Sequence, residues 1–78
     1  MTQLPLLSSN QIISALKRAG FKEARKSSGT HQAFVKDLGD KKITTIVVLG
    51  KKEVPIGTLK SIIKLAEMSD EEFLSYVK

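Results

Sequence analysis

Three strand-like segments follow one another between residues 21 and 49, and only short turn signals separate them. Residues 42–49 are rich in Ile, Val and Thr, whose β-branched side chains favour strands, whereas residues 21–26 and 31–36 alternate more loosely. Sequential strands joined by short turns pair as an antiparallel meander, because the chain reverses direction at each turn. We therefore expect a three-stranded antiparallel sheet, against which the remaining elements pack.

The segment before these strands carries a helix start signal. Ser8 and Gln11 form a capping-box pattern, in which each side chain accepts a hydrogen bond from the other residue's backbone N–H. A helix should begin at about Ser9 and stop near Ala19, because Gly20 suits the left-handed conformation that ends many helices.

The segment after the strands predicts two further helices. Apolar residues recur at helical spacing within residues 57–66, namely Leu59, Ile62, Ile63 and Ala66. Ser69 and Glu72 repeat the capping-box pattern, and acidic side chains crowd the turn that follows, where a helix dipole favours negative charge. A short final helix should therefore begin just after Ser69.

The resulting order is helix, three strands, helix and short helix, in which helices before and after the meander would cover one face of the sheet. We expect one α+β domain over residues 1–78, a two-layer sandwich with the layout of double-stranded-RNA-binding-like domains. Strand alternation places His31 and Phe34 on opposite faces of the middle strand. Alternation alone does not say which face is buried, and we expect Phe34 to cover the core.

Composition limits the partners and cofactors. The 13 Lys and Arg residues exceed the 8 Asp and Glu residues, and the formal charge of +5 suits a nucleic acid or an acidic protein. A solvated basic surface without such a partner explains this charge equally well. The absence of cysteine excludes disulfides and thiolate metal sites, and a single histidine argues against structural zinc. With no signal-peptide or membrane-span pattern, we expect a cytoplasmic protein without metal or cofactor.

The only histidine, His31, is the clearest candidate for proton transfer, because imidazole gains and loses a proton near neutral pH. Candidate phosphate-binding residues near it in sequence are Lys26, Ser28, Gly29, Thr30 and Lys36, of which we rank Lys26 first. A lone histidine at the start of a strand is more often an ordinary surface residue, so its position alone does not establish catalysis.

Three stretches of the chain, taken in order and spacing, resemble the HicA family of toxin mRNA interferases. They are ALKRAGF at residues 15–21, Gly29-Thr30-His31, and GTLKSII at residues 57–63. The resemblance runs from about Leu4 to Val77, and it implies a small ribonuclease toxin with a double-stranded-RNA-binding-like fold. It also implies an essential histidine, which maps onto His31, and neutralisation by a cognate HicB-type antitoxin.

Two positions depart from the pattern of that family. Many members have serine where Thr30 stands, which conserves a hydroxyl group. Many also carry a proline and a second histidine after the third strand, where this chain reads Val48-Leu49-Gly50. A role for a second histidine therefore cannot be carried over to this chain.

RNA supplies its own nucleophile, the 2′-hydroxyl beside each phosphodiester, so a ribonuclease needs neither a metal nor an activated water. His31 as general base would yield a 2′,3′-cyclic phosphate and a 5′-hydroxyl from mRNA. Two alternatives remain open from the sequence. One is a non-catalytic RNA-binding module, and the other is an interaction domain that is always bound to its antitoxin.

Overall fold

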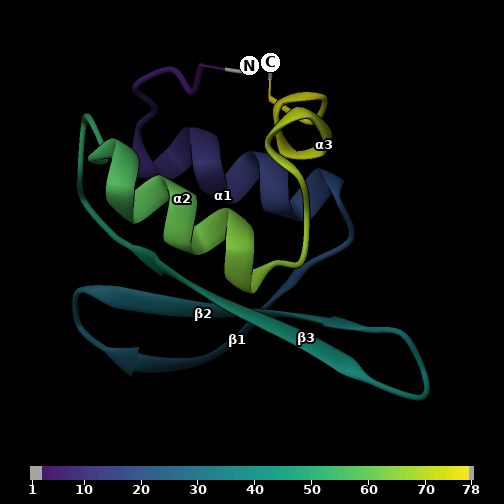
Figure 1. Cartoon of the computed structure of the whole chain (residues 1–78). Coiled ribbons are helices and arrows are strands. Elements are labelled where there is room, and N and C mark those ends of the chain that lie inside the picture. Colours follow the sequence, from purple (N-terminus) through teal and green to yellow (C-terminus); the bar gives the residue numbers. More distant parts are fainter. Residues whose placement is uncertain (1–2, 78) are drawn as a thin grey trace.

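The chain folds into two layers, a three-stranded antiparallel sheet and a layer of helices that covers one of its faces (Figure 1). The computed structural model describes residues 3–77, and of residues 26–28 it describes the backbone alone. The elements in chain order are α1 (Ser9–Arg18), β1 (Lys22–Ser28), β2 (His31–Asp37), β3 (Lys42–Val48), α2 (Ile56–Leu65) and α3 (Asp70–Leu74). This order confirms the predicted α+β sandwich.

The predicted helix signals act as expected. Ser8 caps α1 reciprocally with Gln11, since the Ser8 Oγ accepts from the Gln11 N–H at 3.1 Å and the Gln11 Oε1 accepts from the Ser8 N–H at 2.8 Å. Gly20 follows the helix with φ of 101°, a left-handed conformation that favours glycine. Ser69 caps α3, and its Oγ accepts from the Glu72 N–H at 3.0 Å. The two 10-residue helices both begin at the end of the sheet where β3 finishes (Figure 1).

The strands lie in the order β1-β2-β3, so β2 is central. The register of β2 with β3 is regular and places His31 opposite Val48, whereas the pairing of β1 with β2 shifts between Glu23 and Lys26. The buried Gln32 holds this irregular part of β1, because its Nε2 donates to the backbone carbonyls of Ala24 and Ala33. A buried side chain of the central strand therefore ties β1 to β2 in the hairpin that carries His31.

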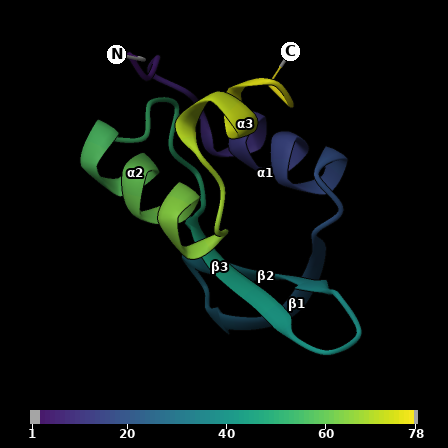
Figure 2. The ribbon, with the colours of Figure 1, turned by 45° about the vertical axis from the view of Figure 1, so that its right-hand side comes forward.

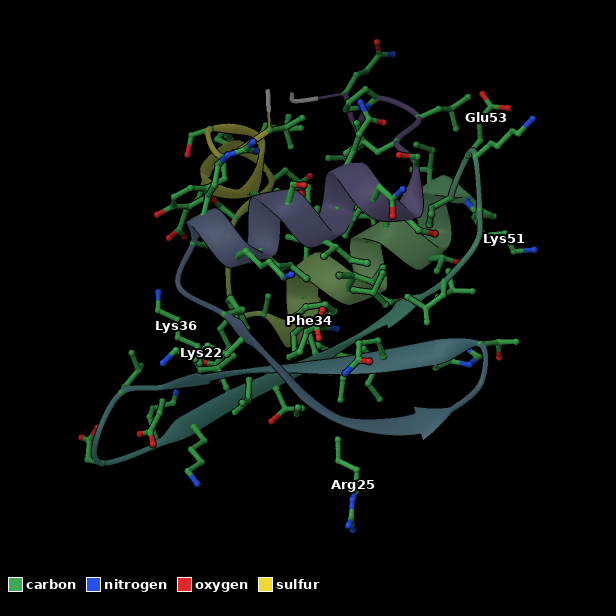
Figure 3. All side chains as sticks on the ribbon, turned by 180° about the vertical axis from the view of Figure 1, so that it is seen from behind. Lys22, Arg25, Phe34, Lys36, Lys51 and Glu53 are labelled. Atoms are coloured by element: carbon green, nitrogen blue, oxygen red, sulfur yellow. The ribbon has the colours of Figure 1, made fainter. Side chains whose placement is uncertain are left out.

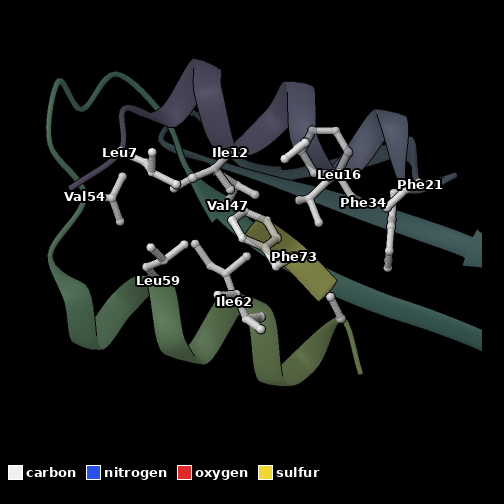
Figure 4. Packing of buried hydrophobic residues seen from close by; sticks show 14 of the residues in the cluster. Leu7, Ile12, Leu16, Phe21, Phe34, Val47, Val54, Leu59, Ile62 and Phe73 are labelled. Carbon is white, nitrogen blue, oxygen red and sulfur yellow. The ribbon is translucent and has the colours of Figure 1, made fainter. Parts of the chain in front are cut away.

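The core lies between the sheet and the helices. Phe34 is fully buried and faces the helices, as expected, and Val47 on β3 lies beneath α1 and α2 (Figure 4). The predicted apolar stripe of α2 is buried, and Phe73 of α3 closes the same core. The buried hydroxyl of Thr45 donates to the Ile62 carbonyl at 2.8 Å, which joins the sheet to α2.

All three helices lie on the same side of the sheet, and its other face carries no element (Figure 2). By alternation and register this open face carries His31, Ala33 and Val35 of β2. Within residues 3–77, no helix combines the length and the apolar character that crossing a bilayer demands.

Candidate active site and nucleic-acid interface

His31 is the first residue of β2 and follows the two-residue turn formed by Gly29 and Thr30. Ser28 and His31 form the last backbone pair of the β1–β2 hairpin, so the imidazole lies at one end of the sheet. Its side chain is exposed, as is that of Thr30. This position allows a large ligand such as a polynucleotide to approach the ring without any part of the protein opening.

The imidazole is oriented by the residue before it. The Thr30 Oγ1 lies 3.0 Å from the His31 Nδ1, within hydrogen-bond distance. A hydroxyl can donate a hydrogen bond to a ring nitrogen or accept one from it. When the Thr30 hydroxyl accepts from the Nδ1–H, Nε2 is the ring nitrogen that carries the basic lone pair. The Thr30 contact therefore suits a tautomer in which Nε2 acts as the base.

Gly29 adopts a backbone conformation that does not require glycine. Its φ lies outside the left-handed region, and a Cβ built on it would meet no atom within 4 Å. The fold alone thus leaves open why this position lacks a side chain, whereas the close approach of a ligand to the turn would explain it. The side chains of Lys26 and Ser28, which the sequence also indicated, lie outside the part of the chain that the structure describes.

Lys36 does not belong to this cluster. It lies five residues along β2 from His31, which at the rise of a strand is about 16 Å, and alternation places it on the other face. Its Nζ lies 5.9 Å from the centre of the Phe21 ring, a cation–π contact at the far end of the sheet. The structure therefore separates Lys36 from the histidine that it neighbours in sequence.

The loop after β3 is brought to the histidine instead. The Leu49 N–H donates to the Thr30 carbonyl at 2.8 Å, which continues the β2–β3 pairing up to the turn. The buried Ser9 then fixes the next residues, because its Oγ donates to the Val48 carbonyl at 2.7 Å and accepts from the Lys51 N–H at 3.0 Å. The loop that carries Lys51 and Lys52 is thus held beside the His31 turn (Figure 3).

A groove of about 270 Å³ lies between this loop and the start of α1. It is lined by Ser8, Ser9, Asn10, Gly50, Lys51 and Lys52. A larger cavity of about 310 Å³ lies between α2 and the start of α3, where the Lys60 Nζ is 2.9 Å from an Asp70 carboxylate oxygen. The groove with the two lysines is therefore formed by the loop that is hydrogen-bonded to the His31 turn through Leu49 and Thr30, and His31 itself does not line it.

The charges are distributed unevenly between the two ends of the molecule. Four of the eight acidic residues, at positions 67 and 70–72, follow α2 or lie in α3. Two of them form ion pairs there, Glu67 with Lys41 at 2.8 Å and Asp70 with Lys60 at 2.9 Å. Within the described residues, Lys51 and Lys52 form no ion pair, and neither α1 nor α2 has an acidic residue in its first turn. Glu53 follows the two lysines in the same loop (Figure 3), so the two lysines and the partial positive charge of the helix starts outweigh one carboxylate at the His31 end and favour an anion there.

Composition and spacing did not single out Lys51 and Lys52 as candidate site residues. Their placement at the same end of the sheet as His31 follows from the register of β2 and β3, which composition and spacing do not give. The pairing of the start of β2 with the end of β3 is the signal that would have identified them. Among the described residues, no three acidic or histidine side chains cluster closely enough to hold a metal ion.

Comparison with known proteins gives one family. Residues 9–68 match the family model described as the HicA toxin of bacterial toxin–antitoxin systems. The matched segment includes α1, all three strands, α2 and the turn that carries His31. A search of curated proteins found no match to the chain.

Proposed function

The chain belongs to the HicA family of toxins of bacterial toxin–antitoxin systems, and from this premise we propose that it is an endoribonuclease with His31 as its general base. The observation that carries the proposal is the Thr30–His31 pair, an oriented and exposed imidazole at the turn to which the loop of Lys51 and Lys52 is hydrogen-bonded. Family membership supports a toxin with a nuclease role in general, and the Thr30–His31 geometry supports our assignment of the proton transfer to His31.

The proposed reaction needs one proton acceptor. The His31 Nε2 takes the proton of a ribose 2′-hydroxyl, and that oxygen attacks the adjacent phosphorus. The P–O5′ bond breaks, and the electron pair goes to the 5′-oxygen, which takes a proton from water or from the imidazolium. The products are a 2′,3′-cyclic phosphate and a 5′-hydroxyl, and no group outside the chain and water takes part.

Charge develops on the non-bridging oxygens of the phosphorus during this step. The backbone N–H groups of Gly29 and Thr30 lie next to the imidazole, and the absence of a side chain at Gly29 allows a phosphate to approach them closely. Lys51 and Lys52 are placed to bind neighbouring phosphates along the groove. We infer that the strand to be cut lies across the turn and the groove.

Aromatic side chains offer no stacking surface at this end. Phe21, Phe34 and Phe73 are buried, and the half-buried Tyr76 lies beyond α3, where its carbonyl accepts from Arg18. Base stacking contributes much of the affinity of typical single-strand binders, so binding here depends mainly on phosphates. We propose mRNA as the substrate and a HicB-type protein as the cognate antitoxin that restrains the enzyme.

The proposal is tested by cleavage of an mRNA transcript by the purified chain in excess EDTA. We expect fragments that poly(A) polymerase extends only after the cyclic phosphate has been removed, and no cleavage of a transcript with 2′-fluoro riboses. His31→Ala should lower the cleavage rate by about 10²- to 10⁴-fold. The matched control is Lys64→Ala. It also removes an exposed side chain, but on α2, and it should leave the cleavage rate unchanged.

Full cleavage by His31→Ala would contradict the proposal. Salt-sensitive RNA binding without cleavage by the unaltered chain would instead identify a non-catalytic RNA-binding module. In that case His31→Ala would leave the RNA affinity unchanged, whereas loss of the Lys51 and Lys52 charges would reduce it.

A further inference from the structure

Ser9, the first residue of α1, is buried where the helix meets the loop that follows β3. We call this loop, residues 49–53, the lysine loop, because it carries Lys51 and Lys52. Ser9 is 3% exposed, whereas most serines in proteins are exposed to solvent. Capping of α1 does not account for this burial, since Ser8 and Gln11 form the capping box. The buried hydroxyl of Ser9 therefore serves another part of the chain.

Ser9 makes three hydrogen bonds with the end of β3 and the lysine loop. Its Oγ donates to the Val48 carbonyl at 2.7 Å and accepts from the Lys51 N–H at 3.0 Å. Its backbone N–H, which lies in the first turn and has no acceptor within the helix, donates to the Lys51 carbonyl at 2.9 Å. One residue thus binds both backbone polar groups of Lys51, which fixes where the Lys51 side chain leaves the backbone.

The same hydroxyl is connected to the proposed base. Val48, whose carbonyl it binds, lies directly opposite His31 in the register of β2 and β3. The next pair along is closed by the Leu49 N–H, which donates to the Thr30 carbonyl at 2.8 Å. One buried side chain thereby joins the residue opposite the imidazole to the first of the two lysines. Ser9 thus sets the position of the lysine loop relative to His31.

The lysine loop has few other contacts that define its conformation. Gly50 has φ of 75°, a left-handed conformation that turns the chain out of the β3 ladder. Lys51, Lys52 and Glu53 are exposed. In the described part of the chain, the hydrogen bonds of residues 50–53 are those between Lys51 and Ser9. The conformation of the lysine loop therefore depends on Ser9.

We propose that Ser9 is a positioning residue for RNA binding, whose hydroxyl holds the lysine loop in one conformation, so that Lys51 and Lys52 meet the phosphates next to the one attacked beside His31. This inference rests on the phosphate contacts of the two lysines in the proposed function. Ser9 acts through the loop, because its hydroxyl is already engaged by two backbone groups. A loop that had to be ordered on binding would reduce the RNA affinity, and the contact with Ser9 removes this cost.

The test measures the Kd for a single-stranded RNA with 2′-fluoro riboses, which lack the attacking hydroxyl, by filter binding. Ser9→Ala should raise the Kd by about three- to tenfold, the change that corresponds to one ordinary hydrogen bond. Thr45→Val is the matched control, because it also removes a buried hydroxyl that donates to a backbone carbonyl, but between the sheet and α2. The control should change the Kd by less than about twofold, since Thr45 shares no partner with the lysine loop.

A double-mutant cycle separates positioning of the loop from general destabilisation of the fold. If Ser9 acts through the lysines, Ser9→Ala should have little further effect on the Kd of a chain that already carries Lys51→Ala and Lys52→Ala. Additive effects on log Kd, or equal effects of Ser9→Ala and Thr45→Val, would overturn the proposal. Ser9→Cys gives the same comparison where Ser9→Ala does not fold, because a thiol fills the site but is a weak donor and acceptor.

Cleavage kinetics provide a second measurement. Ser9→Ala should raise the KM and leave the kcat within about twofold, since phosphates beside the cut are bound equally in the ground state and the transition state. A lower kcat with unchanged KM would overturn the proposal, because the effect would then lie on the reaction at His31.

The outcomes distinguish this inference from the ribonuclease proposal. A chain that binds the RNA without cleaving it, but shows the non-additive cycle, would lose the proposed reaction and retain the role of Ser9. A chain that cleaves RNA through His31, with a Kd that Ser9→Ala does not change, would retain the reaction and overturn the inference.

Discussion

The Thr30 Oγ1 lies 3.0 Å from the His31 Nδ1, so the hydroxyl of one residue fixes the ring of the next at the end of β2. We expect Thr30→Val, which conserves shape and removes the hydroxyl, to lower the kcat for RNA cleavage by about tenfold while KM changes little. Thr30→Ser should restore most of the kcat. Nitrogen NMR of the His31 ring should show a shift in tautomer in Thr30→Val and not in Thr30→Ser. An unchanged tautomer with unchanged kcat would show that Thr30 does not position the base.

Ser9 links the start of α1 to the loop after β3. We expect Ser9→Ala to lower the free energy of unfolding by about 1–3 kcal/mol, because it removes a buried hydroxyl and leaves the Val48 carbonyl and the Lys51 N–H without this partner. Urea unfolding followed by circular dichroism measures the change. Ser61→Ala is the control, since its exposed hydroxyl donates only to the Gly57 carbonyl at 3.2 Å and should cost less than about 0.5 kcal/mol. Equal costs would show that the link contributes no stability.

Lys51 and Lys52 should contribute to RNA affinity through phosphate contacts. The double substitution Lys51→Ala with Lys52→Ala should weaken binding of a single-stranded RNA and reduce the slope of log K against log salt by about 1.4. The control removes the same charge at the acidic end, through Lys41→Ala with Lys60→Ala, whose side chains pair with Glu67 and Asp70. Filter binding at several salt concentrations measures both slopes. A similar decrease of this slope in both double variants would mean that RNA affinity depends on the net charge of the chain and not on the position of Lys51 and Lys52.

Gly29 and Gly39 provide a matched pair of turn glycines. A Cβ at either position meets no atom within 4 Å, but Gly39 has φ of 92° and Gly29 lies outside the left-handed region. Gly39→Ala should therefore cost about 1–2 kcal/mol of stability, whereas Gly29→Ala should leave stability unchanged or slightly higher. We expect Gly29→Ala to lower RNA cleavage several-fold nonetheless, because a methyl group hinders the approach of a phosphate to the turn. The RNA cleavage rate and the melting temperature are measured for each variant. Full cleavage activity of Gly29→Ala would exclude the turn from the proposed site.

Local sequence signals predicted the elements because their causes are local. The capping box of Ser8 and Gln11, the stop at Gly20 and the apolar stripe of α2 act within one or two turns of helix, and the structure confirms each. The predicted helix at residues 57–66 differs from Ile56–Leu65 by one residue at each end. The burial of Phe34 was also expected, since a phenylalanine gains far more from burial than the residues on the opposite face of β2.

The sequence by itself thus determined the order of elements, the two-layer architecture and the choice of His31 as the residue to test. Only the tertiary structure decided which cations join it. Lys36 is near in sequence but lies at the other end of β2, because a strand extends about 3.3 Å per residue. Lys51 is distant in sequence but lies beside the turn, because the antiparallel register brings the end of β3 to the start of β2. The sheet face left uncovered was likewise decided by the packing of three helices on one side (Figure 2).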